Sequence, residues 1–197
     1  TNMHWDYFID INVGMDRTGI AAESALEFFQ NIPQTNALNF VGLHAYDGHN
    51  HEISAKERDK ISEQSMARLI AATNQFLEND INLQKNVVAG TPSFISDLQV
   101  LTRQDYCIET YYSPGTWIYH DTNYDVMMPK TFQVAALILS QVMDFPADGI
   151  ATLNLGHKRW GIDQGKIESF SVPGMEALGW SEEHTMVSIP PENNLEI

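Results

Sequence analysis

The sequence predicts an α/β fold in which parallel strands alternate with helices, followed by a β-rich segment. Two observations support this. Up to about residue 125, short runs of β-forming residues alternate with amphipathic helical patterns, which is typical of parallel βα units. From residue 126 on, short runs are separated by Pro, Gly and Asp instead. Four βα units make half of a TIM-like (β/α)8 barrel, which takes about 250 residues when complete. Either the barrel is open-ended here, or its earlier strands precede this stretch.

The first strand is expected at YFIDINV (7–13), which alternates and is rich in β-forming residues. Apolar residues at helical spacing predict a helix from Ala21 to Ile32, closed by Pro33. FVGLHAY (40–46) is the second expected strand. A capping box at Ser54 then predicts the start of a long helix that extends to Leu77.

NVVAG (86–90) is the third expected strand, and after a weaker helical or looped segment CIETYYSPG (107–115) is the fourth. The pattern changes around DTNYDVMMPK (121–130). Residues 132–143 fit a buried helix by periodicity alone, but we expect a strand because every neighbour reads as one. Further strands are expected in IATLNLG, KIESFSV and HTMVSI.

Composition excludes several classes of partner. The 197 residues are 43% hydrophobic, enough for a sizeable core. Acidic residues number 26 against 11 basic ones, and the net charge of -15 disfavours nucleic acids and anionic membranes. The longest apolar run, at 134–139, is far below the ~20 residues of a membrane helix. We expect a soluble, cytoplasmic protein, with its single cysteine, Cys107, packed in the core.

Glycine-containing turns follow the expected strands, where ligands bind in parallel βα arrays. Arg17 lies between two glycines in NVGMDRTG, and the turns GTPS (90–93) and PGT (114–116) combine glycine with hydroxyl side chains. Backbone amides freed by glycine, with Thr or Ser hydroxyls, can hold one phosphate. Arg17 would donate to a second acidic oxygen of the same ligand. Each turn alone is also what an ordinary βα connection requires.

Three histidines, His44, His49 and His51, lie in HAYDGHNH after the second strand. A His-x-His pair is typical of metal-dependent barrel hydrolases, yet no later His and Asp at strand ends complete such a site. A solvated loop, or a proton-carrying role for His49 or His51, are the alternatives. None of the six lysines ends a barrel strand, so this stretch supplies no amine for covalent attachment of an aldehyde cofactor.

Taken in order, these motifs resemble one family. IDINVGMDRTG is similar to the D-x-G-x-x-R-x-G stretch of alanine racemase-like (fold type III) pyridoxal phosphate enzymes. GLHAYDGH, VVAGTPSF, the run from Glu109 to Asp121, NLGHKRWGID and WSEEH resemble successive motifs of its D-threonine aldolase and D-serine dehydratase branch. The resemblance implies the later half of the barrel at 1–125 and a partial β-domain of D-serine dehydratase-like type at 126–197.

The resemblance also implies roles for individual residues. Arg17 would donate to the phenolic oxygen of the cofactor, Tyr46 would pack on its ring, and Tyr112 or Ser113 would lie near the pyridine nitrogen. His51 is the nearest match to the catalytic histidine of D-threonine aldolases, and His49 is the alternative. The implied phosphate-binding residues are Gly90, Thr91, Gly115 and Thr116.

The activity implied is that of a pyridoxal-phosphate-dependent lyase that cleaves D-3-hydroxyamino acids to glycine and an aldehyde. Three alternatives share this fold: D-serine dehydratase-like elimination, racemisation of an amino acid, and a non-catalytic pyridoxal phosphate carrier. An alternative from another class of protein is a metal-dependent barrel hydrolase. SPG (113–115), where alanine racemase has an arginine, disfavours the racemase.

The resemblance also concerns parts that this stretch does not contain. The family's Schiff-base lysine and its His-x-Asp or His-x-Cys metal pair fall outside these residues. We therefore expect the chain by itself to bind cofactor poorly and to be inactive. For the full-length protein we expect pyridoxal 5'-phosphate, a divalent metal ion (Mn, Mg or Zn), a small D-amino acid substrate and a homodimer.

Overall fold

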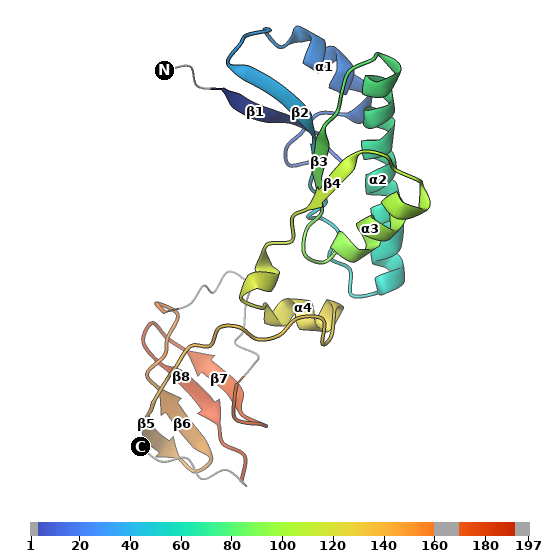
Figure 1. Ribbon diagram of the computed structural model, residues 1–197. Helices are drawn as coiled ribbons and strands as arrows, with labels where there is room; N and C mark the ends of the chain where they lie inside the picture. The colour runs from blue at the N-terminus through green and yellow to red at the C-terminus, as the bar shows by residue number, and fades with distance from the viewer. Residues whose placement is uncertain (1–3, 160–169, 192–197) are drawn as a thin grey trace. The chain divides into compact units, whose positions relative to one another are not determined.

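The computed structural model describes residues 4–159 and 170–191, and the chain forms two compact units, Thr1–Val134 and Ala135–Ile197. The first unit holds a parallel sheet with helices, and the second holds an antiparallel sheet (Figure 1). The predicted fold class is therefore confirmed. The domain boundary expected after residue 125 stays a prediction.

The sheet of the first unit has the order β1-β2-β3-β4, with all neighbours parallel. Its register aligns the carboxyl ends of the strands, because Asp10 pairs with His44, Ala45 with Val88, and Val88 with Tyr112. The loops after the four strands therefore begin at one edge of the sheet. The strands are β1 (Trp5–Asp10), β2 (Leu38–Ala45), β3 (Lys85–Val88) and β4 (Glu109–Tyr112).

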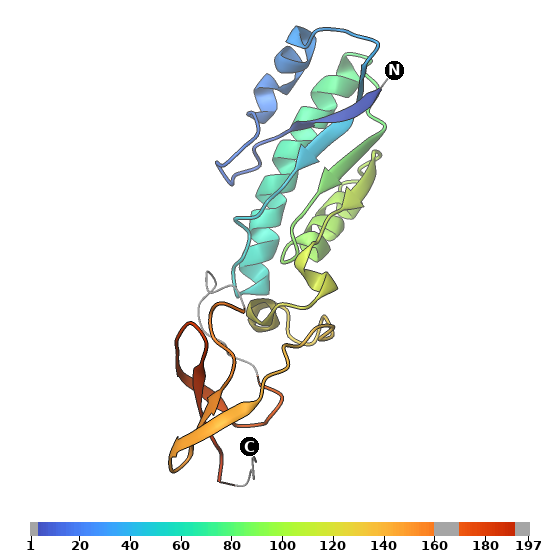
Figure 2. The same ribbon diagram turned by 90° about the vertical axis from the view of Figure 1, so that its left-hand side faces the viewer.

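Helices α1, α2 and α3 lie against one face of this sheet (Figure 2). The Ser54 half of the predicted capping box is present: the Ser54 hydroxyl accepts the Glu57 amide at 3.4 Å where α2 begins. Asp121 caps the short α4 by accepting the Asn123 amide at 2.9 Å. The helices are η1 (Ala22–Ser24), α1 (Ala25–Asn31), α2 (Ala55–Glu78), α3 (Phe94–Arg103), η2 (Thr116–Ile118) and α4 (Thr122–Met127).

Alternate strand residues face these helices and form the core. Leu43 and Ala45 of β2 belong to one buried cluster with Met66, Leu69 and Phe76 of α2. Side chains alternate between the two faces of a strand. Asp10, His44 and Tyr46 are the neighbours of core residues, so they lie on the face opposite the helices.

The second unit is an antiparallel sheet in the order β5-β6-β8-β7, with Ala151, Leu153, Leu155 and Val187 as its buried cluster. The strands expected in IATLNLG and HTMVSI are confirmed as β6 and β8. KIESFSV falls largely outside the described residues. The strands are β5 (Val142–Ala147), β6 (Ile150–Leu153), β7 (Glu176–Trp180) and β8 (Thr185–Ser188).

The strand predicted over residues 132–143 is wrong for most of its length. The chain is irregular up to Gln141, and β5 begins only at Val142. Leu137 and Leu139 in this segment are 80% and 91% exposed. A run of apolar residues forms a strand only when a partner strand pairs with it, and within the described residues no strand pairs with 132–141.

Composition led to expectations about Cys107 and about membrane-spanning helices. Cys107, predicted to be a core residue, is exposed, because it lies in the turn between α3 and β4 rather than in either element. Within residues 4–159 and 170–191, no helix has the length and apolar character needed to cross a membrane.

Candidate functional site

The loop after β1 is shaped by a side chain that caps its backbone. The Asn12 carboxamide oxygen accepts the amides of Gly14 at 3.0 Å and Asp16 at 3.2 Å. Gly14 has φ +127°, a conformation that favours glycine. The turn brings the guanidinium carbon of Arg17 to 5.1 Å from the centroid of the Tyr46 ring. The two glycines around Arg17 thus belong to a turn that carries a cation onto the face of an aromatic ring.

The Tyr46 ring is held between two glycine-containing segments. A Cβ added at Gly48 would lie 2.3 Å from the Tyr46 Cε1 atom, and one added at Gly90 would lie 3.3 Å from Cε2. Both backbones therefore pack against the edges of the ring, and any side chain at Gly48 would displace it. Tyr46 links the loops after β2 and β3.

The loops after β3 and β4 are joined through two threonines. The Thr116 hydroxyl donates to the Thr91 hydroxyl at 2.9 Å, and the Thr116 amide donates to the same oxygen at 3.3 Å. Thr91 is buried, whereas Thr116 is exposed. A Cβ added at Gly115 would have no heavy atom within 4 Å, so the space beside this loop is open.

Ser113 and Tyr112, two predicted site residues near the end of β4, both interact with other residues of this chain. The Ser113 hydroxyl donates to the carbonyl oxygens of Val88 at 3.0 Å and Ala89 at 3.1 Å. Burial raises the pKa of Tyr112, and so does the negative charge of Asp97. The Tyr112 phenol therefore lies near a buried acid.

That buried acid belongs to a pair that sequence reasoning missed. Asp47, 1% exposed, follows Tyr46, and Asp97, 0% exposed, lies in the first turn of α3. One Asp47 carboxylate oxygen accepts the Ser93 hydroxyl at 2.6 Å and the Gly90 amide at 3.2 Å. Burial, and then the charge of Asp47, raise the pKa of Asp97 to about 8. Asp47 directly follows Tyr46 in AYDG, but no local pattern connects it with Asp97.

The two candidate histidines have different surroundings. His51 is exposed, and its amide donates to the His49 carbonyl at 3.1 Å. His49 is partly buried, and a Cβ added at Gly14 would lie 3.0 Å from its Nε2 atom. The His49 imidazole therefore adjoins the Arg17 loop. Within the described residues, no three His, Cys, Asp or Glu side chains gather as a metal site would require, so neither histidine has such a set around it.

Two further contacts near the strand ends, the pairing of His44 with Asp10 and the placement of Tyr124, were not predicted. The His44 Nδ1 atom lies 2.6 Å from the Asp10 carboxylate, on the sheet face that Tyr46 shares. Tyr124 of α4 is half-buried; burial raises its pKa most, a hydrogen bond with Thr116 lowers it, and Tyr46 is close enough to raise it. Tyr124 thus adjoins both Thr116 and Tyr46. Its position after β4, in a segment without strong periodicity, gave no sequence signal.

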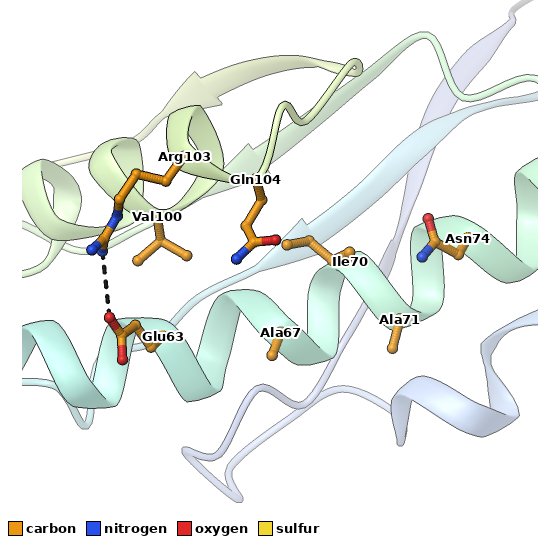
Figure 3. Close-up of a pocket in the computed structure, with 8 residues that line it drawn as sticks. All are labelled: Glu63, Ala67, Ile70, Ala71, Asn74, Val100, Arg103 and Gln104. Atoms are coloured by element: carbon orange, nitrogen blue, oxygen red, sulfur yellow. Dashed lines mark hydrogen bonds and ion pairs between the residues drawn. The ribbon is translucent and has the colours of Figure 1, made fainter.

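A groove of about 590 Å³ lies between α2 and α3 (Figure 3). Arg103 and Glu63 span it with an ion pair of 3.4 Å between two largely exposed side chains. Ala67, Ile70 and Val100 add apolar lining, and none of the residues at the strand ends contributes. The groove is separate from the site described above.

Comparisons with known proteins agree with the fold described above. The profile of the family described as alanine racemase, N-terminal domain, matches residues 1–122. A search of curated protein sequences finds no match. A solved structure of D-threonine aldolase from Filomicrobium marinum is similar with a TM-score of 0.83 and 24% identity, covering 94% of this chain and 50% of that one.

Two other solved structures have the same fold at lower identity. An alanine racemase-like protein from Idiomarina loihiensis has a TM-score of 0.74 and 15% identity, covering 97% of this chain and 54% of its own. A variant of D-threo-3-hydroxyaspartate dehydratase has a TM-score of 0.71 and 17% identity, covering 98% and 52%. The chain therefore spans about half the length of the solved structures it matches.

Proposed function

Because this chain belongs to the alanine racemase N-terminal domain family, we propose that the protein containing it is a pyridoxal-phosphate-dependent lyase acting on D-3-hydroxyamino acids. One observation carries the proposal. Arg17, Tyr46, Thr91 and Thr116 come from the loops of four adjacent parallel strands, and each contacts another of the set or its neighbour. Ligands bind at this edge of parallel βα sheets.

The residues present fit pyridoxal 5'-phosphate. Thr91 and Thr116 offer hydroxyls next to the open space at Gly115, which suits a phosphate. Arg17 offers a guanidinium, which donates well to a phenolate oxygen. Tyr46 offers an aromatic face. The Gly90 amide is already engaged by Asp47, so Gly90 would serve by letting the loop approach Tyr46 rather than as a phosphate donor.

When bound, this cofactor supplies the electron sink for bond cleavage at the substrate α-carbon. The residues of this chain would then have three tasks. Thr91, Gly115 and Thr116 bind the phosphate, and Tyr46 orients the ring. Arg17, permanently protonated, donates to the phenolic oxygen and so keeps a positive charge beside it. Tyr112 and Ser113 border the site from β4.

A histidine would move the proton of the substrate 3-hydroxyl. We favour His49 for this task, because it is partly buried beside the Arg17 loop, and we keep His51 as the alternative because it is exposed. As the histidine takes the proton from the hydroxyl oxygen, the bond between the α- and β-carbons would break and the β-carbon would leave as the aldehyde. The electron pair of that bond would go into the electron sink that the cofactor supplies, and a proton added at the α-carbon would give glycine. Loss of the α-proton together with the hydroxyl, which leaves as water, would instead be the dehydratase outcome.

The aldolase branch is our first choice and the dehydratase branch our second. SPG (113–115) supports this order over a racemase, and two structural neighbours bear the names of an aldolase and a dehydratase. We further propose a divalent metal ion and a homodimer for the whole protein.

The test uses the intact protein that contains this chain, incubated with D-threonine, D-serine and D-alanine. Release of glycine and aldehyde from D-threonine supports the aldolase, and release of ammonia from D-serine supports the dehydratase. Racemisation of D-alanine alone would contradict the lyase assignment. A titration with pyridoxal 5'-phosphate, followed by quenching of protein fluorescence, tests cofactor binding independently of activity.

A further inference from the structure

We propose that Asp47 and Asp97 share a single proton, and that this proton holds the loop at residues 90–93 in the form that receives the cofactor phosphate. The identity of that ligand rests on the proposed function. The pair itself does not, since both carboxylates and the loop lie within this chain.

The pair is enclosed and short of hydrogen-bond donors. Asp47 and Asp97 are 1% and 0% exposed. The second oxygen of Asp47 and both oxygens of Asp97 lack a partner of normal geometry within the described residues. Ser62 and Ser93 adjoin Asp97, but the Ser93 proton is already donated to Asp47 at 2.6 Å. The Ser62 oxygen accepts the Asn50 carboxamide at 2.9 Å, which leaves its proton free for Asp97, so three buried acceptor oxygens face one available hydroxyl donor among the described residues.

Among residues 4–159 and 170–191, no basic side chain donates to these oxygens. The Arg58 guanidinium, on the adjacent helix α2, donates to the carbonyl oxygens of Glu52 at 2.6 Å, Ile53 at 2.8 Å and Met127 at 3.0 Å. Asp59 of α2 is itself acidic and accepts the Ser96 hydroxyl at 2.6 Å.

From β4, the neighbouring titratable group is the Tyr112 phenol, which is neutral near pH 7. No ion pair among the described residues involves Asp47 or Asp97.

Two adjacent buried carboxylates cannot both be ionised at low cost, because each charge is desolvated and repels the other. One proton between them removes one charge and supplies a donor. Burial and the charge of Asp47 raise the pKa of Asp97 to about 8, in agreement with the geometry.

The pair is connected directly to the phosphate loop. One Asp47 oxygen accepts both the Gly90 amide and the Ser93 hydroxyl, and these two residues precede and follow Thr91 in the loop. Loss of the shared proton would place a second negative charge against the loop and would repel a phosphate dianion. Phosphate affinity should therefore fall as the pH rises through about 8, and phosphate binding should strengthen retention of the proton.

The first test follows the proton in this chain without any ligand. Infrared spectra between pH 5 and 9 should show the C=O band of a protonated carboxylic acid at pH 7, which disappears as the pH rises through about 8. Asp97→Asn, which replaces the proton by an amide donor, should lack the band. Asp59→Asn, which removes another acid, on α2 beside α3, should keep it. A spectrum without the band at pH 7 would overturn the proposal.

The second test measures the dissociation constant of pyridoxal 5'-phosphate in the intact protein at pH 7 and pH 9. The wild type and Asp59→Asn should lose about tenfold in affinity, and Asp97→Asn should lose much less. Pyridoxal without phosphate should bind equally at both pH values. An equal loss in Asp97→Asn and wild type would overturn the link between proton and phosphate.

Two other outcomes separate this inference from its rivals. Stabilisation of the wild type, but not of Asp97→Asn, by added K⁺, Mg²⁺ or Ca²⁺ would show a cation in place of the proton and would overturn the pair as proposed. A failure of pyridoxal 5'-phosphate to bind at either pH would contradict the proposed function and the phosphate link, while the infrared band decides the shared proton.

Discussion

Replacing Arg17 by alanine separates a binding role from a structural one. In this chain the guanidinium is exposed, and its contact to the Tyr46 ring, at 5.1 Å, is worth about 0.5–1 kcal/mol at an exposed site. A charge-assisted hydrogen bond from Arg17 to the cofactor would contribute about 1.5–3 kcal/mol. We therefore expect Arg17→Ala to weaken pyridoxal 5'-phosphate binding by roughly 10- to 150-fold. The free energy of unfolding should fall by about 1 kcal/mol or less.

The assay pairs a fluorescence titration of the intact protein with urea unfolding monitored by circular dichroism. Arg103→Ala is the matched control, since Arg103 is also an exposed arginine, its ion pair with Glu63 lies across the groove between α2 and α3, and it is remote from the strand ends (Figure 3). The control should change neither quantity by more than a few tenths of a kcal/mol. Cofactor affinity that is unchanged in Arg17→Ala, or lost equally in both variants, would refute the reasoning.

Four further predictions concern the core, the ring support, the proton carrier and pH. Phe76→Ala should cost about 3–5 kcal/mol of unfolding free energy in urea denaturation, because Phe76 is 0% exposed and packs against Phe29 and Phe40, whereas Phe28→Ala, at a 48% exposed side chain, should cost under about 1 kcal/mol. Gly90→Ala should weaken cofactor binding by shifting Tyr46, since its Cβ would lie 3.3 Å from the ring. Gly115→Ala should leave the melting temperature unchanged, since its Cβ would have no heavy atom within 4 Å. Unchanged cofactor affinity in Gly90→Ala, or a lowered melting temperature in Gly115→Ala, would contradict the site geometry. His49→Asn should lower kcat in the lyase assay by about 100-fold and more than His51→Asn, and a larger effect at His51 would reverse the assignment. The pKa of Asp97 is higher in the folded than in the unfolded chain, so its contribution to the unfolding free energy is full below about pH 4 and is lost as the pH rises toward 8. The unfolding free energy of the wild type, measured relative to that of Asp97→Asn, should therefore fall over this pH range. A difference that stays constant with pH would count against the raised pKa.

The parallel half of the fold was predictable because its signals are local. Ser54 caps α2 as its sequence indicates, and β-forming runs at 40–46 and 86–90 became β2 and β3. Glycine-containing turns identified the strand ends, and parallel topology dictates that such ends meet at one edge. That is why the sequence could assign Arg17, Tyr46, Thr91 and Thr116 to loops that the structure brings to one edge of the sheet, while their roles toward a cofactor stay predictions.

The remainder depends on contacts between distant residues, which local patterns do not report. Asp47 and Asp97 are 50 positions apart and meet only when α3 packs beside the loop after β2. Tyr124 adjoins Thr116 only because η2 and α4 fold the chain back after β4. The apolar segment at 132–141 reads as a strand, but pairing is a property of the partner, and within the described residues no strand pairs with it. β7, in EALGW, lacks the β-branched residues that would have identified it.

A crystal structure of the intact protein grown with pyridoxal 5'-phosphate tests the central claim most directly. We predict the phosphate within hydrogen-bond distance of Thr91 and Thr116, the ring against Tyr46, and the Arg17 guanidinium turned toward the phenolic oxygen. A cofactor bound at another surface of this unit, or a phosphate that contacts neither threonine, would contradict the account.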